Sequence, residues 1–430
     1  MRNDSFWTAD APPYAPPQRL LPAAVDVAVV GAGFTGLSAA LALARRGARV
    51  LLLEQGPQAG AEASTRNGGH VNSGLAIDYA ETAAAYGPAL AAAWYRAYDD
   101  AVDTVQQLVR DEGIACDFIR TGKLKLAARE AGLDGLRRTV ERLHADGVDT
   151  DTEILERDAV RAEVASEQFV GGMLYRRSGQ MHMGRFAHGL AAAVERAGAQ
   201  IEVGTPVQRL ERLGATHRHR VHTPRGVVQA DQVLLATGAT RHGGYGSFGW
   251  IRRRIVPVGS FLIATEPLGE ARAHALLAGR RTYVTVAHIH HYFRLSPDHR
   301  LLFGGRARFA VSNPTQDRSS GEILRQGMEA MFPSLRGVRI DHCWGGLVDM
   351  TRDRLPRAGE RDGLYYATGL SGHGTQMSVH LGRAMARVMA GEAAANPFAG
   401  RPWPAIPGHL GPPWFLPLVG LYYQLKDKLA

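Results

Sequence analysis

Hydrophobic residues near the start of the chain follow two different periods. Val25 to Val30 and Ala48 to Leu53 are short, largely apolar runs, which are typical of buried parallel strands. Between them, Thr35 to Arg46 alternates small and apolar residues and ends near Gly47, which predicts a helix. The pattern therefore predicts a β-α-β unit that ends close to residue 54.

The rest of the chain has helical and extended patterns in separate regions. Helices are predicted at 82–110 (interrupted at Gly87-Pro88), 133–145, 185–197 and 377–389, and strands at 122–127, 200–207 and 231–236. From Ile251 onward the pattern changes to longer strands, at 256–266, 282–295 and 301–309. We expect these strands to form an antiparallel sheet in a second domain.

Length and charge narrow the class of protein. The 430 residues are enough for two or three domains, and a content of 45% hydrophobic and 21% charged residues is typical of a soluble globular protein. The net charge of +9 comes almost entirely from arginines that are scattered along the chain. No platform of interleaved aromatic and basic residues is present, so we expect no nucleic-acid partner.

The cysteines and the N-terminal residues indicate a compartment. Cys116 and Cys343 are the only cysteines, and they form neither a disulfide framework nor a metal-binding spacing. The first thirty residues lack the basic start and apolar stretch of a secretory signal. We expect buried thiols in a reducing, cytoplasmic setting.

The two ends of the chain differ from the rest. Residues 1–24 are rich in proline and are expected to form an extended arm. Residues 413–423 are aromatic and apolar, but this stretch is shorter than the roughly 18 residues that span a bilayer. Lys426 and Lys428 follow it, so packing on the protein itself and peripheral contact with the inner face of a membrane both stay open.

A glycine fingerprint stands where the first predicted strand turns into the helix. Gly31, Gly33 and Gly36 have G-x-G-x-x-G spacing, which allows a tight turn, close approach of the backbone to a pyrophosphate and close packing of helix on strand. The helix N-terminus favours a phosphate. Glu54 lies 18 residues past Gly36, where a carboxylate can accept both ribose hydroxyls of an adenosine. The fingerprint predicts a dinucleotide site and leaves NAD and FAD open.

A second glycine-rich segment lies some three hundred residues later. Residues 367–375 read ATGLSGHGT and precede a predicted helix. An earlier predicted strand also ends in Ala236-Thr237-Gly238. We interpret both as places where the chain returns to the same cofactor.

These features together resemble the D-amino acid oxidase family of FAD-dependent oxidoreductases, and within it the gamma-glutamylputrescine oxidase branch. Besides the first fingerprint, the resemblance is carried by 63–70 (ASTRNGGH), 256–260 (VPVGS), 264–268 (ATEPL), 292–295 (YFRL), 301–306 (LLFGGR), 344–349 (WGGLVD) and 369–374 (GLSGHG). It extends from about residue 5 to the C-terminus.

The resemblance implies an α/β, two-domain flavoprotein. Its Rossmann-like FAD domain would be discontinuous, and its α+β substrate domain would be built on a mostly antiparallel sheet. We expect the arm at 1–24, the FAD domain at 25–95, 165–245 and 340–430, and the substrate domain at 96–164 and 246–339.

The resemblance also implies which residues hold FAD. The first fingerprint would bind the pyrophosphate, residues 64–70 would pass along the isoalloxazine, and residues 372–375 would close over its pyrimidine end. The full set is Gly31, Gly33, Phe34, Thr35, Gly36, Glu54, Gln55, Ser64, Thr65, Arg66, Asn67, Gly68, Gly69, His70, Val207, Thr237, Gly238, Gly345, Gly346, Gly372, His373, Gly374 and Thr375.

The implied reaction is hydride transfer from a carbon that bears an amine to flavin N5, followed by hydrolysis of the imine. Candidates to orient an amine or amino-acid substrate are His70, Arg66, Arg294, Arg306 and Trp344. An arginine among them could clamp a substrate carboxylate. His70 and Trp344 could equally be ordinary core residues.

Two departures from the family pattern affect the chemistry. Sarcosine oxidases of this family bond FAD to a cysteine at the position that Gly346 occupies here, so we expect non-covalent FAD. They also use a lysine near flavin N5 to activate oxygen, and the matching strand, 301–305, has none. The electron acceptor therefore stays open between oxygen, a quinone and a carrier.

Two alternative functions stay open from the sequence, and a third interpretation, a metal site, is not favoured. One is a D-amino acid or N-methyl amino acid dehydrogenase, and another is a flavin-bound assembly subunit without turnover. A third, a metal site at His288, His290 and His291, has no further ligand nearby in the sequence, and we expect no metal.

Overall fold

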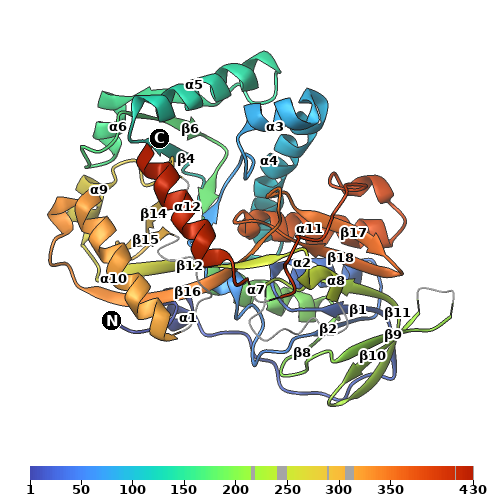
Figure 1. The fold of residues 1–430 in the computed structure, drawn as a ribbon. Helices are drawn as coiled ribbons and strands as arrows, with labels where there is room; N and C mark the ends of the chain where they lie inside the picture. Colours follow the sequence, from blue (N-terminus) through green and yellow to red (C-terminus); the bar gives the residue numbers. More distant parts are fainter. Residues whose placement is uncertain (215–217, 240–248, 288–289, 306–313, 412, 430) are drawn as a thin grey trace.

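The computed structural model describes residues 1–214, 218–239, 249–287, 290–305, 314–411 and 413–429 (Figure 1). Two eight-stranded sheets organise these residues, and a short pair of strands, β3 (His70–Val71) and β7 (Gly179–Gln180), lies apart from them. Two of the four clusters of buried apolar side chains lie against each sheet.

The first sheet has the order β17-β18-β11-β1-β2-β8, and its central strands are parallel. Strands β9 and β10 extend it as an antiparallel ribbon beside β11. The bounds are β1 (Ala24–Val30), β2 (Val50–Leu53), β8 (Gln200–Glu202), β9 (Arg209–Arg212), β10 (His219–Thr223), β11 (Gly226–Leu235), β17 (Arg357–Arg361) and β18 (Leu364–Thr368).

Helices α2 (Phe34–Arg45), α4 (Pro88–Asp111), α7 (Met183–Arg196) and α11 (Gly374–Met389) contribute to one core beside this sheet. Helix α2 and helix α11 pack closely, since the Ser38 hydroxyl donates to the Val379 carbonyl at 2.7 Å. A Cβ at Gly382 would lie 2.4 Å from the Thr35 carbonyl oxygen. The two glycine-rich segments of the sequence therefore meet in space.

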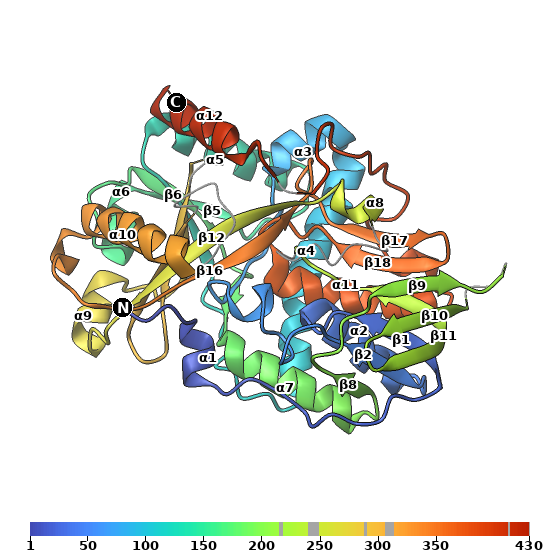
Figure 2. The same cartoon turned by 60° about the horizontal axis from the view of Figure 1, so that its bottom comes forward.

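The second sheet has the order β16-β12-β15-β14-β13-β4-β6-β5 and is antiparallel except where β13 pairs with β4. Its strands are β4 (Lys123–Ala127), β5 (Glu153–Glu156), β6 (Gly171–Tyr175), β12 (Val256–Thr265), β13 (Thr282–Thr285), β14 (His291–Leu295), β15 (Leu301–Gly305) and β16 (Ile340–Met350). In Figure 2, β12 and β16 run side by side across the middle of the molecule.

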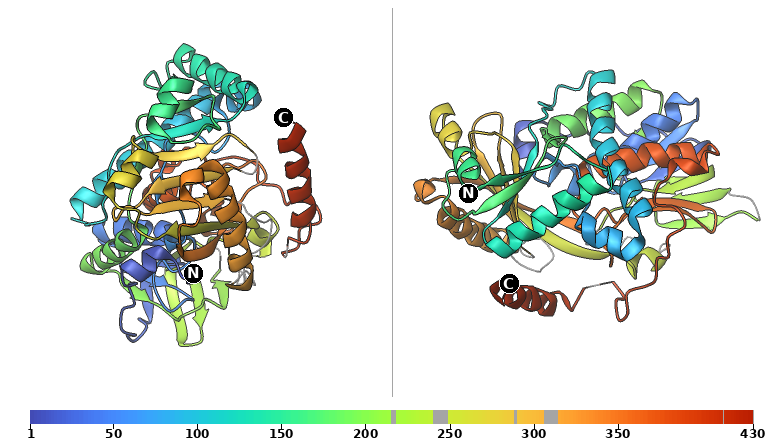
Figure 3. Two further views of the ribbon diagram at one scale, coloured as in Figure 1. Left: turned by 90° about the vertical axis from the view of Figure 1, so that its left-hand side faces the viewer. Right: turned by 90° about the horizontal axis from the view of Figure 1, so that it is seen from above.

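Helices α9 (Glu270–Leu276) and α10 (Pro314–Met331) adjoin one core of the second sheet, while α3 (Tyr79–Tyr86) and α5 (Glu130–Ala145) contribute to another. The structure also has helices α6 (Arg157–Glu163), α8 (Gly249–Arg252) and α12 (Leu416–Leu429). Short 3-10 helices lie at Ala63–Thr65, Pro333–Leu335 and Ala393–Ala395. Figure 3 shows α12 at the margin of the molecule.

Three predicted elements differ from the structure. The strand predicted at 200–207 is only the three residues of β8, Gln200–Glu202. For the strand predicted at 301–309, the residues after 305 lie outside the described residues. The extended run at 282–295 is two antiparallel strands, because Tyr283 and Val284 of β13 pair with Phe293 and Tyr292 of β14. The N-terminal arm is not extended throughout, because helix α1 (Phe6–Asp10) interrupts it. The proline content hid this helix, whose Phe6 and Trp7 are buried.

The domain boundaries given above stay a prediction. Strand pairing places β6 and β16 in the second sheet, although the predicted ranges 165–245 and 340–430 group them with the FAD domain. Within the described residues, no helix combines the length and the apolar character that crossing a bilayer requires.

Candidate functional site

One cavity of about 1300 Å³ runs from the carboxyl end of β1 to the C-terminal helix α12. This volume exceeds the roughly 300–1000 Å³ of ordinary small-molecule pockets. Its lining comes from both sheets and from segments as distant in sequence as Val30 and Tyr423. The cavity is therefore large enough for a long cofactor together with a second molecule.

The inner end of the cavity is built from the backbone of the first glycine turn. Gly31 has φ 103°, and a Cβ there would lie 2.9 Å from the carbonyl oxygen of Ala236. A Cβ at Gly36 would lie 1.9 Å from the Gly31 oxygen. The turn thus requires glycine at both positions, and it directs the first turn of α2, which contains no acidic side chain, toward the cavity.

Glu54 lies at the end of β2 and lines the same end of the cavity. Its carboxylate accepts hydrogen bonds from the amides of Ala32 and Gly56, each at 2.8 Å. Burial raises the pKa of Glu54, and the amide hydrogen bonds oppose that rise. The acid is therefore fixed beside the glycine turn, as a ribose acceptor would need to be.

The segment 63–70 crosses the cavity as a tightly held loop. The Ser64 hydroxyl accepts from the Phe34 amide at 3.1 Å, and the Asn67 side-chain oxygen accepts from the Gly69 amide at 2.8 Å. Gly69 has φ 73°, and a Cβ there would lie 2.6 Å from the Met181 carbonyl oxygen. This crowding by the backbone explains why residue 69 is a glycine. Without a side chain there, the loop can lie close along a flat ring.

Arg294 braces this loop from behind. It is 2% exposed, and its guanidinium donates to the carbonyls of Gly68 and Met181 at 3.0 Å and to Gln180 Oε1 at 2.8 Å. Burial lowers the pKa of Arg294 to about 9. Three of its five N–H donors are used in these bonds, and Arg294 does not line the cavity, so it does not face a substrate carboxylate there.

The N-terminal helix supports the loop as well, which sequence reasoning missed. The Trp7 indole donates to the Asn67 carbonyl and the Ser5 hydroxyl to the Thr65 carbonyl, both at 2.7 Å. Trp7 also lies below the Arg294 guanidinium, 5.2 Å from ring centre to Cζ. An apolar Phe6-Trp7 pair inside a proline-rich arm was the available signal.

The second glycine segment closes the cavity opposite the loop. Helix α11 begins at Gly374 without an acidic residue in its first turn or a side-chain cap. In the described part of the chain, His373 Nδ1 and Thr237 Oγ1 are buried polar atoms without a hydrogen-bond partner, and both residues line the cavity. Unsatisfied buried polar atoms around a cradle of glycine backbone fit a bound group with its own donors and acceptors.

The two histidines beside this region are held in the neutral form. Burial places the pKa of both His70 and His373 well below the ordinary value, and Arg294 and Lys123 add to this for His70. His70 pairs with Gln180 across strands β3 and β7, and its ring makes an edge contact with Tyr292, 5.6 Å between centroids.

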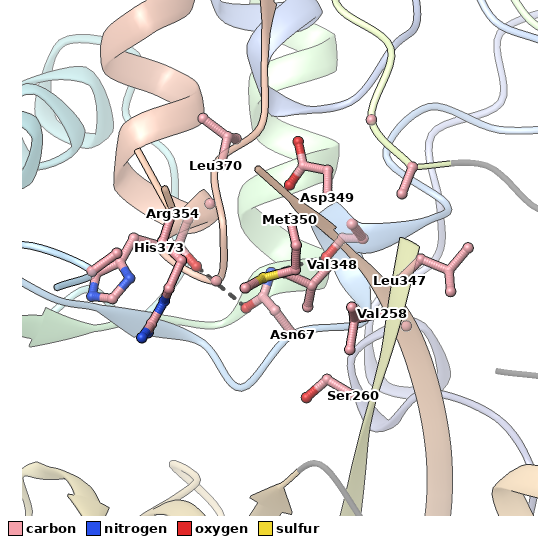
Figure 4. A pocket seen from close by; sticks show the side chains of 18 of the residues that line it. Asn67, Val258, Ser260, Leu347, Val348, Asp349, Met350, Arg354, Leu370 and His373 are labelled. Carbon is pink, nitrogen blue, oxygen red and sulfur yellow. Dashed lines mark hydrogen bonds between the residues drawn. The ribbon is translucent and has the colours of Figure 1, made fainter. Parts of the chain in front are cut away.

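The middle of the cavity is walled by the two long strands. Figure 4 shows Val258 and Ser260 of β12 and Leu347 to Met350 of β16 along this wall, with Asn67 beside Met350 and His373 further to the left. Asp349 accepts from the Gly369 amide at 2.7 Å and so ties β16 to the second glycine segment. Burial raises its pKa.

The outer end is lined by long charged side chains, which sequence reasoning did not single out. They are Asp78, Glu81, Lys123, Lys125, Arg129 and Arg354. Lys123 and Lys125 alternate with leucines on β4, so both point to one face of that strand. This alternation was visible in the sequence, but nothing there showed that the face lines a cavity.

The other sequence-predicted residues divide as follows. Those that line the cavity are Gly31, Gly33, Phe34, Thr35, Glu54, Gln55, Ser64, Arg66, Asn67, Gly68, His70, Val207, Thr237, Gly238, Gly346, Gly372, His373, Gly374 and Thr375. Gly36, Thr65, Gly69 and Gly345 lie just behind the lining. Arg306 lies outside the described residues.

Trp344, one of the candidates for an aromatic wall, is fully buried away from the cavity. Its indole donates to the Arg66 carbonyl at 3.2 Å, and Arg66 in turn donates to the Gly345 carbonyl. Trp344 therefore positions the loop and does not face a substrate. Neither Cys116 nor Cys343 lines the cavity.

His290 lines the cavity and His291 is described, whereas His288 is not. Within the described ranges, no three histidine, cysteine or acidic residues cluster as metal ligands. The expectation that the protein binds no metal stays a prediction.

The C-terminal helix covers the outer mouth. Phe415, Leu416, Val419 and Tyr423 line the cavity, while Trp414, Leu418, Leu421 and Tyr422 are exposed on other sides of the same segment. Packing on the protein therefore accounts for only part of this apolar segment.

A dinucleotide-binding parallel sheet, a second antiparallel sheet and one long cavity between their loops define a two-domain FAD-dependent oxidoreductase. The chain belongs to the family described as FAD dependent oxidoreductase, the D-amino acid oxidase family, which matches residues 26–388. The sequence-based predictions of family, fold class, FAD cofactor and oxidation of an amine or amino acid are confirmed at this level.

Relatives and solved structures agree. The chain is 32% identical to a probable oxidoreductase OrdL of Haemophilus influenzae, over 94% of this chain and 92% of that protein. It is 31% identical to the gamma-glutamylputrescine oxidoreductase of Escherichia coli, over 100% and 99%. The structure resembles glycine oxidase from Geobacillus kaustophilus with a TM-score of 0.71 at 22% identity, covering 86% of this chain and 96% of that one.

Proposed function

We propose that the protein oxidises the amine of a substrate that carries a carboxylate at its far end, as gamma-glutamylputrescine does. The observation that carries this proposal is the outer chamber, where cations and carboxylates line one continuation of the cofactor cavity. The full-length similarity to a gamma-glutamylputrescine oxidoreductase supports it.

FAD, when bound, accepts a hydride from the carbon beside the substrate nitrogen. The turn at Gly31 and the N-terminus of α2 would bind its pyrophosphate, and Glu54 would bind the adenosine ribose. The loop at 64–70, braced by Arg294, would hold the ring plane, and the α11 N-terminus with His373 would stabilise negative charge at its pyrimidine end. Neutral His70 and His373 add no positive charge there.

The two signs of charge in the chamber suit a substrate with both. Lys125 and Arg129 are available for a carboxylate. Glu81 is available for an ammonium group at the same end, and Asp78, whose carboxylate caps α3, adds negative charge beside it. Burial lowers the pKa of Lys125, which a bound carboxylate would counteract. A simple diamine would lack the carboxylate contact, so we expect it to bind more weakly.

We infer that FAD is held without a covalent bond, because neither cysteine lines the cavity and Gly346 stands at the position where sarcosine oxidases of the family have the linking cysteine. Acid precipitation should therefore release the flavin into the supernatant. A pellet that stays yellow would contradict the inference.

A second candidate is a dehydrogenase that passes electrons to a membrane quinone. The exposed Trp414, Leu418, Leu421 and Tyr422 beside the cavity mouth favour it, because Lys426 on the same helix would suit an anionic bilayer surface. Flotation of the full chain with anionic vesicles, compared with a Trp414→Ser, Leu421→Ser variant, tests the membrane contact.

Anaerobic bleaching of the flavin tests the proposed reaction. Gamma-glutamylputrescine should bleach the flavin at lower concentration than putrescine, glycine or D-alanine. Putrescine lacks the carboxylate, and glycine and D-alanine lack a second amine beside the one that is oxidised. Reoxidation by oxygen against a soluble quinone then identifies the acceptor. Bleaching by D-alanine alone would favour the D-amino acid dehydrogenase, and bleaching by no amine would favour a non-catalytic subunit.

A further inference from the structure

Lys123 stands in the cavity in an unusual setting for a lysine. It lies on β4 between β13 and β6, and only 6% of the residue is exposed, although it lines the cavity. Lysine is among the residues least often buried without a partner of opposite charge. Its environment therefore needs an explanation beyond packing.

Two fixed acceptors surround the Lys123 amine. Nζ donates to the Ser73 carbonyl at 2.7 Å and lies 3.7 Å from the centre of the Tyr175 ring. The described residues place no carboxylate within ion-pair distance of Nζ. A neutral amine has two N–H groups and one lone pair, so these acceptors can take both hydrogens and leave the lone pair for a further proton.

Charged and titratable groups face Lys123 from each neighbouring element. They are Lys125 on its own strand, Asp99 on α4, Asp149 before β5, Tyr175 on β6, His70 on β3 and His373 before α11. Burial, with Lys125 next, lowers the pKa of Lys123 to about 7, against the pull of Asp99 and Asp149. About half of the amine is therefore neutral, and available as a base, at pH 7.

We propose that Lys123 is the base that removes a proton from the ammonium group of the substrate before oxidation. The N–H bond of the ammonium breaks, its electron pair stays on the substrate nitrogen, and the proton bonds to Lys123 Nζ. No electron leaves the substrate in this step. The products are a free amine, whose carbon can release a hydride, and the Lys123 ammonium.

The proposal rests on the proposed amine oxidation and explains a requirement of it. An aliphatic amine has a pKa near that of free lysine, about 10.4, so nearly all of it is protonated at pH 7. An ammonium nitrogen has no free lone pair, so it cannot form the C=N bond of the imine as the hydride leaves. A base inside the cavity supplies the neutral form where the reaction takes place.

Labelling offers a direct test that does not use activity, because the chain contains only four lysines, Lys123, Lys125, Lys426 and Lys428. In the FAD-bound protein labelled with ¹³Cε-lysine, one NMR signal should titrate near pH 7, and it should vanish in Lys123→Met. Titration of the Lys123 signal near pH 10 would overturn the proposal.

Kinetics of anaerobic flavin reduction supply the second test. The wild-type rate constant at low substrate should rise with pH through about 7, because protonated Lys123 cannot accept a proton. Lys123→Met should lose that inflection and fall about 10²–10³-fold at pH 7, with less loss near pH 10 where free amine is abundant. Lys123→Arg should fall similarly, because a guanidinium keeps the charge and does not act as a base.

The variants also separate the base from other roles. If Lys123→Arg kept the wild-type rate, the charge and not the base would matter, and the proposal would be wrong. Flavin absorbance of each variant reports folding, and the wild-type titration stands even if a variant does not fold. Absence of bleaching in the wild type would instead refute the amine oxidation itself.

Discussion

The two ends of the cavity use different parts of the chain. The dinucleotide end is made mostly of backbone, with glycines, amide N–H groups and the starts of α2 and α11, and Glu54 is the buried charge beside the glycine turn. The substrate end is made of side chains that extend from β4, α3 and neighbouring loops. The first therefore tolerates almost no change of backbone shape, whereas the second can be retuned one side chain at a time.

The largest effect should come from changing the backbone end. Gly31→Ala forces a side chain into φ 103° and against the Ala236 oxygen at 2.9 Å. We expect purified protein without flavin absorbance and with a lower melting temperature. Gly135→Ala is the matched control, because its Cβ meets only Arg138 Nη2 at 3.7 Å, and it should keep its colour. A Gly31→Ala protein that kept its flavin absorbance would contradict the claim that the dinucleotide end depends on backbone shape.

At the other end, Lys125→Met should change substrate binding and leave FAD bound. Removal of the cation should raise the concentration of gamma-glutamylputrescine needed for half-maximal flavin bleaching by about 10- to 100-fold, which corresponds to about 1.4–2.8 kcal/mol. Putrescine, without a carboxylate, should change far less. An equal loss for both amines would show that Lys125 does not recognise the carboxylate.

Glu54→Gln tests the buried acid at the backbone end. The amide side chain has one acceptor oxygen in place of two. That oxygen can accept from the Ala32 or the Gly56 amide, which leaves less acceptor capacity for the ribose hydroxyls. We expect the dissociation constant of FAD, measured by fluorescence after removal of the flavin, to rise about tenfold. Unchanged affinity would remove the ribose role from Glu54.

The smallest effect concerns a buried acid behind the substrate end. Asp99 has one oxygen without a partner in the described structure, and burial, together with Asp149, raises its pKa to about 7. Its folded pKa exceeds the unfolded value near 3.9, so the protein loses stability as pH rises from about 4 to 7. Asp99→Asn should therefore raise the melting temperature by a few degrees at pH 8 and not at pH 4.

The same variant sharpens the proposal for Lys123, since Asp99 attracts its proton. Asp99→Asn should shift the Lys123 NMR titration to lower pH. A shift in the opposite direction would mean that the two groups do not interact as the structure indicates.

The contrast between the ends also explains what the sequence could predict. Glycine spacing encodes backbone shape locally, so Gly31, Gly33 and Gly36 identified their end of the cavity, and the return of the chain at 367–375 was visible for the same reason. Arg294 and Trp344 stayed candidates for substrate contact, because a sequence does not show whether a side chain faces a cavity or a loop behind it.

Lys123 was missed for a related reason. A lysine on a short strand usually reaches solvent, and only the pairing of β4 with β6 and β13 shows that this one is enclosed. Helix α1 was missed because prolines around it dominated the pattern, although Trp7 carries the contact that matters.

The loop at 63–70 is held by N-terminal residues and faces residues from near the C-terminus, and this arrangement has a consequence for biosynthesis. The loop is fastened by Ser5 and Trp7, whereas the cradle it faces is completed only by residues 364–389. Nearly the whole polypeptide must therefore be synthesised before the binding site for the prosthetic group is complete. Loading has to follow translation, and shortened chains should leave the ribosome colourless.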